Sequence, residues 1–134
     1  MTIAFWTILM AVLMPWMLAA ATKASAVRRR KYNNKAPRDF LAGLQGASQR
    51  ANWAQQNSFE ILPGYIAAVI IAHMVGVEQS HIDLLAVTFV ISRILYEGCY
   101  IRNLATLRSA VWFIGLLCIV GLFAISAQSS GLKS

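Results

Sequence analysis

The stretch MTIAFWTILMAVLMPWMLAAAT, residues 1–22, contains no charged side chain. About 20 apolar residues in a helix are enough to cross the hydrocarbon core of a bilayer. A secretory signal peptide carries positive charge before its apolar run, whereas here the first charges, Lys23 and the basic cluster Arg28–Lys31, come after it. We therefore expect an uncleaved first transmembrane helix at about residues 2–22.

Three further stretches are apolar enough to cross a membrane, and we place them at about 51–77, 84–101 and 109–128. Inside a bilayer the backbone polar groups must bond to one another, which leaves only helices and closed barrels. Long apolar runs without two-residue alternation exclude a barrel. The sequence therefore predicts an all-α integral membrane four-helix bundle that forms a single domain over residues 1–134.

The composition is typical of a membrane protein. Hydrophobic residues make up 58% of the chain and charged residues only 13%, whereas a soluble domain has about 25% charged residues. A net charge of +7 suggests nucleic acid at first, but eight of the twelve Lys and Arg residues lie between positions 23 and 50, beside apolar spans. Basic residues in such places set orientation and contact anionic lipid, so we expect the lipid bilayer, and no nucleic acid, as the partner.

The charges of the loops predict the orientation of the protein. The loops at 23–50 and 102–108 are basic, whereas the loop at 77–83 contains no Lys or Arg. The positive-inside rule places basic loops in the cytosol. With an even number of spans, both termini then lie on the non-cytoplasmic side. This pattern suits a multi-pass protein of a bacterial inner membrane.

Three ionisable side chains fall inside the predicted spans, namely Glu60, Arg93 and Glu97. Such groups are costly in lipid and usually face protein or water. Glu60 lies nine residues beyond Ala51, which is roughly 14 Å along a helix. Arg93 lies nine residues before Arg102, at a similar depth. Because the second and third spans are expected to run antiparallel, Glu60 and Arg93 can meet.

Helical spacing places these groups in two polar stripes. Residues three or four apart share one face of a helix, which groups Arg50, Trp53, Asn57 and Glu60 in the second span and Arg93, Tyr96, Glu97 and Tyr100 in the third. Two such stripes could line a cavity for a polar anionic ligand. Further positive charge could come from Arg108, at the cytosolic mouth of the fourth span, or from Arg38 in the loop. Alternatively, Glu60 and Arg93 form a structural ion pair and the tyrosines are interfacial anchors. Spacing alone leaves both interpretations open.

Four short patterns resemble those of one family, the membrane-associated proteins in eicosanoid and glutathione metabolism (MAPEG). The patterns are Asn57-x-x-Glu60-x-x-Pro63, Arg93-x-x-Tyr96-x-x-x-Tyr100, the loop segment Tyr32-Asn33-Asn34-Lys35-Ala36-Pro37-Arg38, and Leu107-Arg108-Ser109-x-x-Trp112. They occur in order and cover nearly the whole chain.

The resemblance implies a homotrimer of four-helix protomers with glutathione as co-substrate between neighbouring protomers on the cytosolic side. By position it implies a set of glutathione-binding residues, Asn57, Glu60, Arg93, Tyr96 and Tyr100, to which we add Arg50 as a candidate. It also implies that Tyr96, Tyr100 or Arg108 faces the sulfur and acts in catalysis. One position departs from the family pattern. Trp53 stands where catalytic members usually carry an arginine, and the nearest arginine is Arg50.

The resulting hypothesis is a membrane-bound glutathione-dependent transferase or peroxidase that acts on hydrophobic small molecules arriving from the lipid. Trp53 motivates an alternative, a non-catalytic member of the family that binds lipid or a partner protein. A small multidrug exporter is a further alternative, although its carboxylate usually lies in the first span, which is charge-free here. Cys99 and Cys118 lie in apolar segments, where thiols more often pack than bind metal, so we predict no metal site.

Overall fold

The computed structural model describes residues 1–28 and 35–131. Its helices are α1 (Ile3–Arg28), α2 (Pro37–Ala42), α3 (Gly46–Met74), α4 (Gln79–Ile101) and α5 (Ala105–Gly131). Helices α1, α3, α4 and α5 are long and apolar enough to cross a membrane. The predicted all-α architecture with four membrane-spanning helices is therefore confirmed for the described residues. Most of the basic cluster Arg28–Lys31, and the first part of the loop motif, lie outside them.

Three of the helices begin earlier than the predicted spans. Helices α3, α4 and α5 begin at residues 46, 79 and 105, whereas the spans were placed from 51, 84 and 109. The spans were bounded by apolar composition, but a helix continues through polar residues near the membrane surface, where side chains reach water. The predicted loop at 23–50 is also partly helical, because it contains the end of α1, all of α2 and the first turn of α3.

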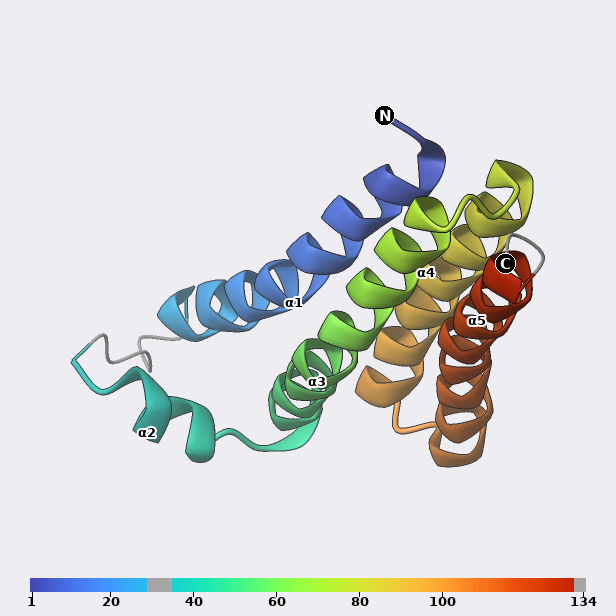
Figure 1. Cartoon of the computed structure of the whole chain (residues 1–134). Coiled ribbons are helices and arrows are strands. Elements are labelled where there is room, and N and C mark those ends of the chain that lie inside the picture. The colour runs from blue at the N-terminus through green and yellow to red at the C-terminus, as the bar shows by residue number, and fades with distance from the viewer. Residues whose placement is uncertain (29–34, 132–134) are drawn as a thin grey trace.

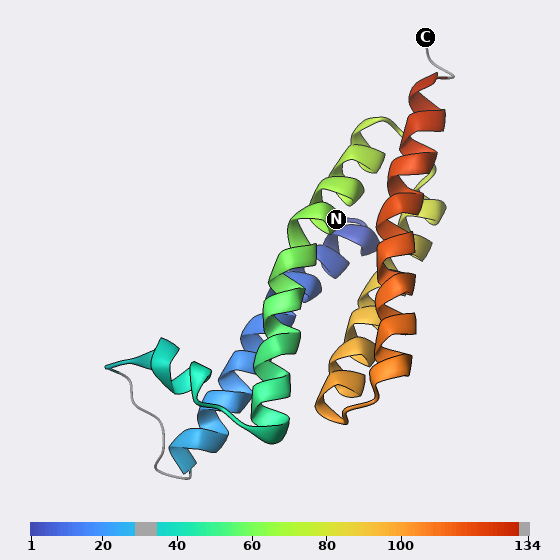
Figure 2. The ribbon, with the colours of Figure 1, turned by 90° about the horizontal axis from the view of Figure 1, so that it is seen from below.

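Helices α3 and α4 form the centre of the bundle, and each packs against both α1 and α5. Figure 1 shows α1 and α5 on opposite sides of this central pair, with α1 diverging from the others toward α2. The turn between α3 and α4 lies toward the end of the bundle that holds the start of α1 and the end of α5, and the turn between α4 and α5 lies toward the other end (Figures 1 and 2). The start of α1 and the end of α5 thus lie toward the same end of the bundle. Which side of the membrane that end faces stays a prediction.

The α3–α4 turn and the α4–α5 turn share one backbone conformation. Gly76 and Asn103 have positive φ angles of 75° and 60°, the left-handed conformation that commonly ends a helix. In each turn the next N–H returns to a carbonyl five residues earlier, from Val77 to Ala72 at 3.0 Å and from Leu104 to Cys99 at 2.9 Å. These closures reverse the chain within a few residues and make α3, α4 and α5 antiparallel neighbours.

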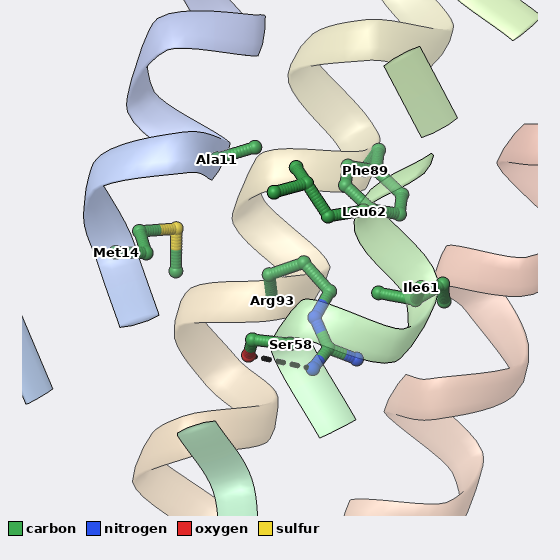
Figure 3. A pocket seen from close by; sticks show the side chains of 7 residues that line it. All are labelled: Ala11, Met14, Ser58, Ile61, Leu62, Phe89 and Arg93. Carbon is green, nitrogen blue, oxygen red and sulfur yellow. Dashed lines mark hydrogen bonds between the residues drawn. The ribbon is translucent and has the colours of Figure 1, made fainter. Parts of the chain in front are cut away.

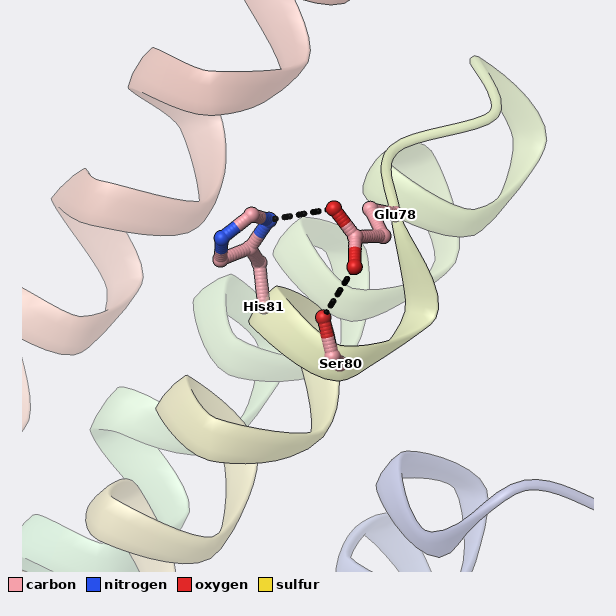
Figure 4. Close-up of polar contacts among 3 residues, drawn as sticks. All are labelled: Glu78, Ser80 and His81. Carbon is pink, nitrogen blue, oxygen red and sulfur yellow. Dashed lines mark hydrogen bonds and ion pairs between the residues drawn. The ribbon is translucent and has the colours of Figure 1, made fainter.

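Polar contacts at the α3–α4 turn fix the start of α1. Asp83 Oδ1 accepts the backbone N–H of Ala4 and the side-chain N–H of Gln79, both at 2.8 Å, so a carboxylate satisfies a donor in the first turn of α1. Nearby, Glu78 accepts from the Ser80 hydroxyl at 2.7 Å and lies 3.6 Å from His81 (Figure 4). Glu78 and His81 are exposed, and a surface pair of this kind contributes little stability.

A buried aromatic pair joins three helices in the core. Tyr65 of α3 is stacked on Phe89 of α4, with ring centroids 3.8 Å apart. The Tyr65 hydroxyl lies 2.6 Å from Thr7 Oγ1 in α1 and donates to the Ala86 carbonyl at 3.4 Å. A buried hydroxyl is costly without a partner; here its partners lie on α1 and α4. This contact fixes how far α1, α3 and α4 are shifted along their axes relative to one another. It therefore also fixes the relative positions of the polar residues on these helices.

Close packing between α4 and α5 depends on Gly115. A Cβ atom at this position would lie 2.9 Å from Ser92 Oγ, and that hydroxyl already donates to the Phe89 carbonyl at 2.7 Å. We predict that Gly115→Ala lowers the free energy of unfolding by about 1 kcal/mol relative to Gly121→Ala, because the added methyl must push α5 away or break the Ser92 bond. Melting in detergent micelles measures the difference.

The Gly121→Ala variant is the matched control, because a Cβ there would meet Leu85 at 3.5 Å, an ordinary contact distance. Both variants gain the same helix propensity, so only the contact differs. Equal melting temperatures for the two variants would show that Gly115 is not needed for the approach of α4 and α5.

Candidate functional site

An open groove of about 460 Å³ lies between α3 and α4. It is lined by Trp53, Gln56, Asn57 and Glu60 of α3 and by Tyr96 and Tyr100 of α4. Five of these six residues belong to the two stripes predicted from helical spacing. The sixth, Gln56, lies three residues after Trp53 and four before Glu60, so it fits the same spacing although the predicted stripe does not include it. The packing of α3 against α4 thus brings the stripes to one surface feature.

Arg93 lies behind this groove and is almost completely buried, with 3% of its surface exposed. Its Nη2 atom donates to Asn57 Oδ1 and to Ser58 Oγ, both at 3.1 Å. Its guanidinium carbon lies 4.1 Å from the centre of the Tyr96 ring, a distance at which a cation is attracted by the ring face. Arg93 is therefore held rigidly by α3 and by its own helix.

The predicted direct contact between Glu60 and Arg93 is not formed. Within the described residues Arg93 makes no ion pair, and Glu60 is exposed. The Asn57 side chain stands between them, because it accepts from Arg93 and its Nδ2 atom lies 3.4 Å from Glu60 Oε2. Asn57 is almost one helical turn before Glu60, and its amide bonds to both side chains. The interpretation of Glu60 and Arg93 as a locked ion pair is thus wrong within this protomer.

Ser58 connects Arg93 to a different carboxylate. The Ser58 hydroxyl oxygen accepts from Arg93, and its hydrogen is directed to the Ala54 carbonyl at 3.0 Å or to Glu97 Oε1 at 3.3 Å. Glu97 is therefore the carboxylate linked to the buried guanidinium through one hydroxyl. Reasoning from the sequence missed Ser58; the available signal was its spacing of four from Ala54, which gives α3 a small-residue face toward α4.

Tyr100 joins the groove to α5. Its ring lies 5.5 Å from Tyr96 in an edge-on arrangement and 6.4 Å from Trp53, measured between centroids. The guanidinium carbon of Arg108 lies 4.5 Å from the centre of the same ring. Arg108 thus contacts a groove-lining side chain, although it does not itself line the groove.

Arg50 lies away from the groove. Its Nε atom donates to the Ile101 carbonyl at 3.0 Å, at the end of α4, where a cation interacts favourably with the unpaired carbonyls of a helix terminus. Arg50 is not among the groove-lining residues, so the structure does not bring it together with Asn57 and Glu60. It lies on the predicted stripe but about two turns below Asn57.

The groove therefore offers one available carboxylate, two amides and two tyrosines, with Arg93 and Arg108 close behind. This combination suits a ligand that carries both ammonium and carboxylate groups, such as a small peptide. A model of one protein family, described as the MAPEG family, matches residues 3–128 of the chain. No curated protein matches it.

Proposed function

The chain belongs to the MAPEG family, an integral membrane family linked to glutathione and eicosanoid metabolism, and on this premise we propose that it is a glutathione-dependent transferase or peroxidase acting on hydrophobic electrophiles. The observation that carries the proposal is the groove in which Asn57, Glu60, Tyr96 and Tyr100 lie together beside Arg93. The basic loops and the apolar spans support a location in a bacterial inner membrane with the groove open toward the cytosol.

The groups of the groove match those of glutathione in charge. The peptide has one ammonium and two carboxylates. Glu60 is exposed and has only a long contact to Asn57, so it is available for the ammonium. Arg93 and Arg108 lie over the rings of the groove-lining Tyr96 and Tyr100 and would attract the carboxylates or the thiolate. Charge-assisted hydrogen bonds of this kind are the strong ones.

The nucleophile in this chemistry is the thiolate and not the thiol. A guanidinium or a tyrosine hydroxyl beside the sulfur stabilises the thiolate by charge and hydrogen bonding. Tyr96, Tyr100 and Arg108 are the residues that we propose for this role, because Arg108 packs on the Tyr100 ring and both tyrosines line the groove. The sulfur would then attack an apolar electrophile that enters from the lipid.

We further propose that the functional unit is a homotrimer with glutathione between protomers. Glu60 lies within a membrane-spanning helix and is exposed in a single protomer. A charged side chain at membrane depth normally faces protein or water and not lipid. A second copy of the chain packed over the groove would remove Glu60 from lipid and close the ligand site.

We predict that the purified protein binds glutathione and conjugates it to an apolar electrophile such as 1-chloro-2,4-dinitrobenzene. Calorimetry in detergent measures binding, and absorbance measures turnover. Absence of binding at about 10 mM glutathione, well above the usual range of KM values, would contradict the proposal. S-methyl glutathione is the matched ligand, because it should occupy the same groove without turnover.

Trp53 supports one second candidate, a non-catalytic member that binds lipid or a partner through the groove. Trp53 lines the groove and is 44% exposed, and it brings no charge to a place where catalytic members usually carry an arginine. We predict that Trp53→Arg strengthens glutathione binding by about tenfold, the effect of one added charge-assisted hydrogen bond, whereas Trp53→Gln does not. If the parent protein does not bind glutathione and the Trp53→Arg variant does, the non-catalytic function is favoured. Strong turnover by the parent protein would exclude it.

A further inference from the structure

Two nitrogen atoms of Arg93 have no hydrogen-bond partner among the described residues. These atoms are Nε and Nη1, while Nη2 alone serves both Asn57 and Ser58. Buried N–H groups are nearly always paired, because leaving one unpaired costs the full desolvation of the group. The guanidinium, at 3% exposure, is therefore a donor with unused capacity in the middle of the bundle.

A small cavity adjoins this guanidinium. Figure 3 shows Arg93 and Ser58 among apolar side chains from three helices, including Ala11 and Met14 of α1, Ile61 of α3 and Phe89 of α4. The space for the centre of a water-sized molecule is about 10 Å³, which is about what one water needs. The cavity thus has room for one oxygen atom, apolar walls and an arginine in its lining.

The first helix is interrupted beside the cavity. Pro15 is fully buried and lies within α1. It has no N–H and cannot donate to the carbonyl of Ala11, a residue that lines the cavity. The cavity therefore lies beside a turn of α1 that has lost one helical hydrogen bond.

We propose that this cavity is a binding site for one uncharged oxygen acceptor, which pairs with a free N–H group of Arg93. The volume admits one oxygen, and the lining residues other than Arg93 and Ser58 are apolar. Two sources supply this chemistry: a water molecule, or the carbonyl or peroxide oxygen of an apolar compound from the bilayer. The second source rests on the proposed function, because the guanidinium would then polarise the oxygen of the electrophile.

A double-mutant cycle on stability tests the site. Ala11→Leu fills the cavity and displaces the oxygen. We expect it to lower the melting temperature by roughly 4 °C more in the parent than in the Arg93→Met background, where no N–H group is left unpaired. The difference between the two backgrounds measures the coupling between residue 11 and the arginine. Equal shifts of the melting temperature in the two backgrounds, together with no stabilisation by decan-2-one, would overturn the proposal.

Two ligands of similar length distinguish the sources of the oxygen. We would add decan-2-one or decane to the full-length protein in micelles without glutathione. Stabilisation by the ketone alone, lost in both Ala11→Leu and Arg93→Met, supports an apolar oxygen compound. Coupling in the cycle without a ketone effect supports water. Equal stabilisation by decane, with no coupling, overturns the site. Because no thiol is present, these outcomes are independent of whether the protein conjugates glutathione.

Discussion

Arg93→Met is expected to raise the Kd for glutathione by roughly 100-fold or more. Arg93 is the buried cation behind the groove, and its guanidinium holds the Asn57 side chain that lines it. The substitution removes a positive charge near the ligand carboxylates and releases the amide from its position. Loss of hydrogen bonds to charged groups costs about 1.5–3 kcal/mol each, which corresponds to the expected change. Calorimetry with glutathione and with S-methyl glutathione measures it.

The control for this variant is Arg102→Met, which removes an arginine from the exposed end of α4. It changes the net charge by the same amount but leaves the groove intact, so glutathione binding should change little. Elution volume and melting temperature of both variants show whether the fold is kept. An Arg93→Met variant that is folded and binds glutathione as the parent does would contradict the proposed role of Arg93.

Glu60→Gln is expected to weaken glutathione binding by roughly 10- to 100-fold while leaving the melting temperature unchanged. Glu60 is exposed and makes no ion pair within the described residues, so its charge contributes to ligand binding more than to folding. The amide keeps the shape of the side chain but cannot pair with an ammonium group. A charge-assisted hydrogen bond contributes about 1.5–3 kcal/mol, which sets the expected range.

Glu97→Gln should show the opposite pattern and is the matched comparison. Glu97 is linked to Arg93 through Ser58 and does not line the groove. Its neutralisation leaves the buried guanidinium without its nearest counter-charge, so the melting temperature should fall, with a smaller change in glutathione affinity. If Glu97→Gln abolished binding and Glu60→Gln had no effect, the proposed assignment of the two carboxylates would be reversed.

The general form of the groove was predictable because helical spacing determines which residues share a face. Asn57 and Glu60 on one helix, and Tyr96 and Tyr100 on the other, recur at intervals of three or four, and these four residues line the groove. Spacing does not determine the height of one helix against the other or the rotamer of a long side chain. For that reason the contact of Ser58 with Arg93 could not be predicted.

By itself, the sequence was sufficient to predict four membrane-spanning helices, since charge-free runs such as residues 1–22 can be buried in lipid only as helices. It also indicated that Arg93 would need polar partners. Only the tertiary structure decided which partners these are: Asn57 and Ser58 in place of Glu60. The reason is that the choice of partner depends on how closely α3 approaches α4. A hydrogen bond forms only where the donor and acceptor atoms lie about 3 Å apart.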